Sequence, residues 1–76
     1  MIRENDIVVL KEDITNTTLV KDDMGTVVHV YAEEKGYEVE FVSADGKTIA
    51  VETLPKKAIR AFKKFEILHS RSLATA

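Results

Sequence analysis

Two glutamates at a spacing of two residues, Glu38 and Glu40, come closest to a catalytic arrangement in this sequence. On a β-strand both side chains point to one face, and two carboxyl groups can divide the acid and base roles of a reaction when a cleft desolvates them. Nothing in the sequence predicts such a cleft, and charged residues that alternate with apolar ones are typical of a strand with one solvated face. We therefore interpret the pair as part of a binding surface.

The other polar residues lack the spacing of a metal, nucleophile or phosphate site. Neither histidine, His29 or His69, has a second histidine or a cysteine at ligand spacing, since the chain contains no cysteine. The acidic turn residues do not follow the calcium-loop pattern, the serines lack a glycine-flanked elbow, and the three glycines are isolated. We predict a protein that is not an enzyme and has no metal site and no cofactor.

Charge is distributed unevenly along the 76 residues. Residues 1–55 carry a net charge of −7, whereas residues 56–76 carry +5. An acidic body repels the phosphate backbone of nucleic acids and attracts a basic protein surface, so it favours a protein partner. The predicted partner-binding residues combine acidic and aromatic side chains: Asp22, Asp23, Tyr31, Glu38, Glu40, Phe62 and Phe65.

The basic segment supports an alternative, an RNA- or ribosome-associated module. The Gly-Thr-Val run at residues 25–27 is similar, over these few residues, to the KOW motif of ribosomal and transcription-factor barrels. Binding to phosphates through lysine and arginine would weaken steeply as salt rises. The predicted nucleic-acid contacts are Lys56, Lys57, Arg60, Lys63 and Lys64. A third hypothesis, compatible with the first, is self-association through Phe62 and Phe65.

Short β-strands must position these residues, and runs of β-branched residues indicate the first two. The first strand is predicted over residues 6–12, with Val8 and Leu10 facing the core. The second, over residues 25–31, begins at Gly25, a position that a side chain would crowd. Alternation along it predicts two faces, one with Val28 and Val30 and the other with Val27, His29 and Tyr31.

A hairpin follows the second strand. Residues 37–42 alternate between apolar and acidic side chains, which predicts a strand with an inward face of Tyr37, Val39 and Phe41. The Asp-Gly pair at residues 45–46 favours a tight turn. The return strand is predicted over residues 48–52, with Ile49 and Val51 inward.

Two structures are compatible with the segment after Pro55. One is a turn and a short closing strand over residues 58–60, and the other is a helix from Lys56 onward with its apolar residues on one stripe. We favour the turn and strand, followed by a tail that is partly helical. This divides the chain into a barrel domain over residues 1–61 and a basic extension over residues 62–76.

Four to five short strands with tight turns predict an all-β fold, a small SH3-like barrel of about five antiparallel strands. Five runs, in this order along the chain, resemble a family of small bacterial proteins classified as domain of unknown function DUF4926: residues 5–10, 23–31, 37–42, 45–48 and 54–55. The resemblance covers about residues 2–61 and implies an SH3-like barrel without an established activity, so it supplies no catalytic residues. The extension from Phe62 departs from the usual short ending of this family.

We therefore expect a non-enzymatic binding module whose acidic surface binds a protein partner, for example a neighbour-encoded protein that it neutralises or regulates. No apolar run approaches the roughly 18 residues that span a bilayer. The first residues are polar and acidic, unlike a secretion signal. These observations lead us to expect a cytoplasmic protein with no membrane partner.

Overall fold

The computed structural model describes residues 1–63, which form one five-stranded antiparallel sheet. Its strands are β1 (Ile7–Leu10), β2 (Met24–Val30), β3 (Tyr37–Val42), β4 (Thr48–Leu54) and β5 (Ile59–Ala61). Short 3-10 turns precede β3 and β5, namely η1 (Ala32–Glu34) and η2 (Lys56–Ala58). The prediction of an all-β fold with about five antiparallel strands is confirmed.

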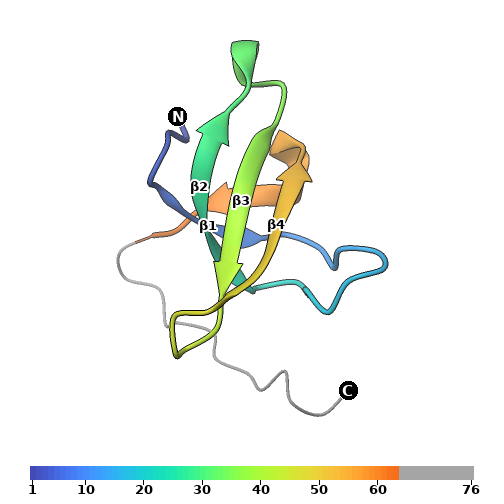
Figure 1. Cartoon of the computed structure of the whole chain (residues 1–76). Coiled ribbons are helices and arrows are strands. Elements are labelled where there is room, and N and C mark those ends of the chain that lie inside the picture. Colours follow the sequence, from blue (N-terminus) through green and yellow to red (C-terminus); the bar gives the residue numbers. More distant parts are fainter. Residues whose placement is uncertain (64–76) are drawn as a thin grey trace.

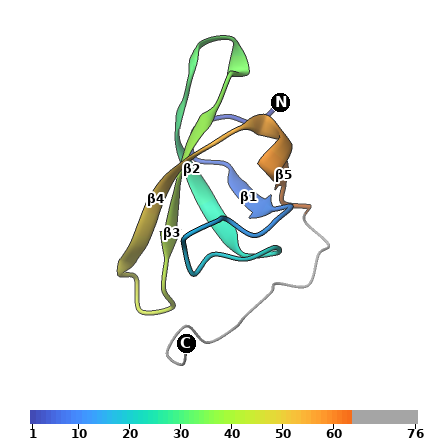
Figure 2. The ribbon, with the colours of Figure 1, turned by 90° about the vertical axis from the view of Figure 1, so that its right-hand side faces the viewer.

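The strand order is β4-β3-β2-β1-β5, so β4 and β5 form the two edges of an unclosed sheet. Figure 1 shows β1 and β5 running across the direction of β3 and β4. In the view of Figure 2, β3 and β4 lie on one side and β1 and β5 on the other. The coiled sheet therefore encloses a core between its two ends, with β2 as the strand that joins them.

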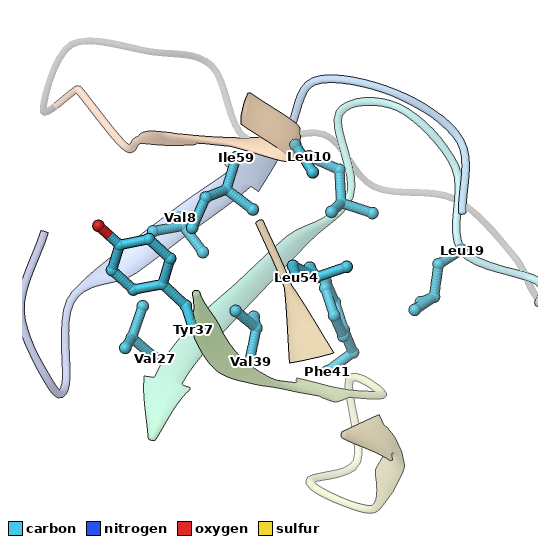
Figure 3. Packing of buried hydrophobic residues seen from close by; sticks show 10 residues of the cluster. Val8, Leu10, Leu19, Val27, Tyr37, Val39, Phe41, Leu54 and Ile59 are labelled. Carbon is cyan, nitrogen blue, oxygen red and sulfur yellow. The ribbon is translucent and has the colours of Figure 1, made fainter. Parts of the chain in front are cut away.

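The core is built from apolar side chains of all five strands and of the loop after β1 (Figure 3). Val8 and Leu10 of β1 are buried as predicted, and Leu19 folds back onto the cluster. In β3 the predicted alternation is confirmed. The cluster consists of Val8, Leu10, Leu19, Val27, Tyr37, Val39, Phe41, Leu54, Ala58 and Ile59, and Val9 of β1 is buried as well.

Gly25 is buried in β2 opposite Val8 of β1, at a point where the core leaves no room for a side chain. A Cβ atom at this position would lie 2.5 Å from Cγ1 of Val39 and 2.9 Å from Cε1 of Phe41. It would also lie 3.0 Å from the carbonyl oxygen of Glu40. The predicted crowding is confirmed, and its cause is the close approach of β3.

The predicted faces of β2 are wrong beyond Val27, because the strand contains a β-bulge. Val27 pairs with Val39 and His29 pairs with Glu38, so Val28 is an extra residue in the ladder. A bulge reverses the alternation of side chains that follow it. Val27 is consequently buried and Val30 packs against the core, whereas Val28 and His29 both face solvent.

The inward positions predicted for Ile49 and Val51 of β4 are also wrong. Directly opposed residues of antiparallel strands lie on the same face, and Phe41 pairs with Ala50 while Tyr37 pairs with Leu54. Ala50 therefore packs against the core, Leu54 is buried, and Val51 is 50% exposed. The register shifts beside Val42, so apolar character alone does not reveal which face of β4 is buried.

The turn between β3 and β4 follows the prediction. Gly46 has a φ of 87°, and the N–H of Ser43 donates to the carbonyl of Lys47 at 2.8 Å. The Asp45 carboxylate accepts hydrogen bonds from the Ser43 hydroxyl and from the N–H of Lys47, and these bonds lower the pKa of Asp45. The carboxylate thus stabilises the turn on the side away from the core.

The segment after Pro55 adopts the turn and short strand rather than a helix. The N–H of Phe62 donates to the carbonyl of Ile7 at 3.1 Å, which extends the pairing of β5 with β1 by one residue. The predictions that involve Lys64, Phe65 and a partly helical tail concern positions outside residues 1–63. Among residues 1–63 we find no helix with the length and apolar character that crossing a membrane requires.

Candidate functional site

The solvent-facing side of β2, β3 and β4, here called the outer face, carries Glu38 and Glu40, two of the residues predicted to bind a partner. Two rows of paired residues cross it. Thr26, Glu40 and Val51 form one row, and His29, Glu38 and Thr53 form the other. Glu38 and Glu40, which alternate with the buried residues of β3, therefore occupy the middle of this face.

Threonine hydroxyls of β4 hold both carboxylates of the outer face. The hydroxyl of Thr48 donates to Oε2 of Glu40 at 2.7 Å, and the hydroxyl of Thr53 donates to Oε1 of Glu38. Each carboxylate retains acceptor capacity, because an ionised carboxyl group can accept about four hydrogen bonds. The arrangement orients the two carboxylates without neutralising them.

An aromatic pair lies at the end of the face where β2 leaves the sheet. The rings of His29 and Tyr31 meet edge to face, with centroids 4.8 Å apart and an interplanar angle of 84°. Nδ1 of His29 lies 3.7 Å from Oε2 of Glu4. Desolvation raises the pKa of Tyr31, and the hydrogen bond and negative charge of Glu38 raise it further. Tyr31 and Glu38, both predicted partner-binding residues, therefore lie close enough to interact.

The Glu38→Gln variant tests this interaction. We expect the pKa of Tyr31 to fall toward its ordinary value, because glutamine supplies no negative charge to oppose the phenolate. The ring-carbon chemical shift of Tyr31, followed by NMR from neutral to strongly alkaline pH, measures the change. Glu33→Gln, a charge removal at an exposed position in η1, should leave the titration as it is. An unchanged pKa in Glu38→Gln would contradict the interaction.

Exposed apolar side chains lie on the same three strands as the two carboxylates. They are Val28 of β2, Val42 of β3, and Ile49 and Val51 of β4, and Val51 pairs directly with Glu40. The ion pairs found within residues 1–63 join Glu4 to His29, Glu33 to Lys35 and Glu34 to Lys56, so none uses Glu38 or Glu40. The outer face therefore offers two oriented negative charges among exposed apolar side chains.

Asp22 and Asp23 do not belong to this cluster. They precede β2, whereas Tyr31 follows it, so the strand separates the two groups. The N–H of Asp22 donates to the carbonyl of Leu10, and the Asp23 carboxylate accepts from the N–H of Val20 at 2.9 Å. Both residues organise the connection from β1 to β2. The acidic set predicted from the sequence is thus divided between a structural turn and the outer face.

The basic residues gather elsewhere, around a shallow hollow of about 570 Å³ between the N-terminal residues and β5. Lys56, Lys57 and Arg60 line it together with Lys11, which the sequence did not suggest. Lys56 also pairs with Glu34 at 3.5 Å. Phe62 is half-buried and Lys63 is exposed. Self-association through Phe62 and Phe65 stays a prediction.

Sequence reasoning missed several members of the outer face. His29 was interpreted as an ordinary strand residue, and Val51 was placed in the core. Thr48 and Thr53 were given no role, although their hydroxyls position the carboxylates. Thr53 lies opposite Glu38, but a single sequence does not contain the pairing of β4 with β3. Within the described part of the chain, no three histidine, aspartate or glutamate residues are grouped so that they could hold a metal ion.

Comparison with known proteins bears on the part of the chain that forms the sheet. No curated protein and no solved structure matches the chain. The family model described as "Domain of unknown function (DUF4926)" matches residues 4–61, which include all five strands. The sequence resemblance is therefore confirmed, and the chain belongs to the DUF4926 family.

Proposed function

We propose that the protein is a non-enzymatic binding module whose outer face binds a basic surface of a protein partner. The observation that carries this proposal is that threonine hydroxyls orient the carboxylates of Glu38 and Glu40 on a face with exposed apolar side chains. We propose further that the module works in the bacterial cytoplasm and neutralises or regulates a neighbour-encoded protein.

The composition of the outer face supports this proposal. Protein interfaces combine apolar contact area with polar groups that set specificity, and complementary charge accelerates association and excludes wrong partners. Val28 and Val51 supply exposed apolar area beside the carboxylates. Because hydroxyl groups already orient Glu38 and Glu40, less side-chain freedom is lost when a partner binds.

Affinity capture from an extract of the source cells tests the proposal. The wild-type protein should retain a partner, and the Glu38→Lys, Glu40→Lys double variant should retain at least about tenfold less, because two attractive charges become repulsive in the centre of the interface. Quantitative mass spectrometry of the retained proteins provides the measurement.

The matched control is the Glu12→Lys, Glu33→Lys double variant. It changes the net charge equally at two exposed residues outside the outer face. We expect it to retain the partner as the wild-type protein does. Equal capture by both double variants and the wild-type protein would show that the outer face is not the binding surface.

An RNA-associated module is a second candidate, favoured by the gathering of Lys56, Lys57 and Arg60 around one hollow. If RNA binds there, the Lys11→Gln, Lys57→Gln double variant should bind a mixed RNA pool about tenfold more weakly at low salt and show a shallower salt dependence. Filter binding over a salt series measures both quantities. Absence of wild-type binding at low salt would exclude this candidate.

A further inference from the structure

The edge of β4 offers a route for a partner to reach the two carboxylates. β4 is the longer of the two edge strands, and it contains neither proline nor lysine. Proline, lysine and bulges are common protections against strand pairing at such an edge. The bulge beside Val42 protects only the beginning of β4, which leaves residues 50–54 regular.

The direction of the backbone groups identifies which residues of β4 face outward. The N–H of Tyr31 donates to the carbonyl of Gly36, so Gly36 directs its backbone groups toward β2. Successive residues of a strand direct these groups to opposite sides, so Tyr37 and Val39 direct theirs toward β4. Their partners Leu54 and Glu52 therefore bond to β3.

Val51 and Thr53, which alternate with these residues, direct their N–H and C=O groups away from the sheet. The loop and turn hydrogen bonds found within residues 1–63 do not include the backbone of either residue. Each also lies in one row with an outer-face carboxylate, because Val51 pairs with Glu40 and Thr53 pairs with Glu38. The free backbone groups and the carboxylates thus share the same two rows.

We propose that an extended segment of the partner adds to the sheet as a strand beside β4, with arginine or lysine side chains two residues apart opposite Val51 and Thr53. This inference rests on the proposed function and specifies its partner. Strand addition obtains affinity from main-chain hydrogen bonds and specificity from alternate side chains.

The distances along each row suit long basic side chains. Neighbouring strands lie about 4.8 Å apart, so the backbone of an added strand would lie roughly 10 Å from that of β3. An arginine opposite Val51 can pack its aliphatic stem on the exposed valine and place its guanidinium at Glu40. In the same way, an arginine opposite Thr53 can place its guanidinium at Glu38.

The charge distribution favours a basic segment of a partner over a second copy of the chain as the added strand. Residues 1–55, which include β1 to β4, carry a net charge of −7 against +5 on residues 56–76, so two copies that pair β4 with β4 would bring their acidic parts together. Glu52, between Val51 and Thr53, adds a further negative charge on the opposite side of β4. A basic segment relieves this charge, whereas a second copy doubles it.

Fluorescence anisotropy with the full chain tests the proposal. The probe is a labelled seven-residue peptide with arginine at its third and fifth positions and valine or threonine elsewhere. The control peptide has the same sequence but carries N-methyl groups on the amides that would pair with β4. We expect the control to bind at least about tenfold more weakly, since it keeps the charges but cannot add to a ladder.

Two pairs of protein variants complete the test. Val51→Pro removes an outward N–H that β3 does not use, so the sheet should persist while peptide binding falls about tenfold. Val51→Thr keeps this N–H and should bind within about threefold of the wild-type protein. Glu38→Gln, Glu40→Gln should weaken binding about tenfold, and Glu12→Gln, Glu33→Gln should leave it unchanged.

The outcomes separate strand addition from the proposed function. Equal binding of both peptides, with loss of binding only in Glu38→Gln, Glu40→Gln, would overturn strand addition but support the outer face as the binding surface. Loss in no variant would overturn both. Sedimentation that shows a wild-type dimer and a Val51→Pro monomer would assign the edge to a second copy, and competition by RNA for the peptide would assign the site to nucleic acid. Either result overturns the proposal.

Discussion

Gly25→Ala should lower the free energy of unfolding by about 3 kcal/mol, because it places a methyl group in a core that has no room for it. The added Cβ would lie 2.5 Å from Cγ1 of Val39 and 3.0 Å from the carbonyl oxygen of Glu40. Val39 is fully buried, and the carbonyl oxygen belongs to Glu40 in the paired strand β3. Relief therefore requires β2 and β3 to separate.

Urea denaturation followed by circular dichroism measures this loss, and each kcal/mol should also lower Tm by about 4–8 °C in a domain of this size. Gly36→Ala is the matched control. A Cβ at Gly36 would meet its nearest neighbour, the carbonyl oxygen of Leu54, at an ordinary 3.5 Å. Equal stability of the two variants would show that β2 and β3 do not approach each other as described.

Tyr37 should show two opposite effects of substitution. Its side chain is fully buried, so Tyr37→Ala should lower the free energy of unfolding by about 3–5 kcal/mol through lost burial and a cavity. Figure 3 shows its ring within the apolar cluster, beside Val8 and Val27. The hydroxyl oxygen is buried and has no hydrogen-bond partner among the described residues.

Tyr37→Phe removes only this hydroxyl group. Since a buried polar group without a partner costs about 1–3 kcal/mol, the variant should be as stable as the wild-type protein or more stable. Parallel urea titrations of Tyr37→Ala and Tyr37→Phe provide the comparison. A loss of more than about 1 kcal/mol in Tyr37→Phe would reveal a hydrogen bond that the hydroxyl makes in solution.

Local signals in the sequence were sufficient to predict much of the fold. Strict alternation over residues 37–42 predicted the buried face of β3, and the lone glycine before a β-branched run predicted the crowded position in β2. These features depend on a residue and its near neighbours. The Asp-Gly turn at residues 45–46 is of the same kind, because positive φ is a local requirement.

The two β-bulges could not be predicted in this way. An extra residue such as Val28 is recognised only from the register of the partner strand, which a single sequence does not contain. Ile49 and Val51 are the most apolar residues of β4, yet pairing with β3 turns the smaller Ala50 inward. For this reason the sequence predicted Glu38, Glu40 and Tyr31 as binding residues but not the valines and threonines beside them.

The pairing of β1 with β5 has a consequence for folding during synthesis. Val8 lies opposite Ala61, so one side of the first strand stays unpaired until the last strand has left the ribosome. β2, β3 and β4 are joined by short turns and can pair early, whereas contacts between distant parts of a chain form slowly. A nascent chain that ends before Ile59 would therefore expose one side of β1 and part of the apolar cluster, and it would be a natural substrate for chaperones.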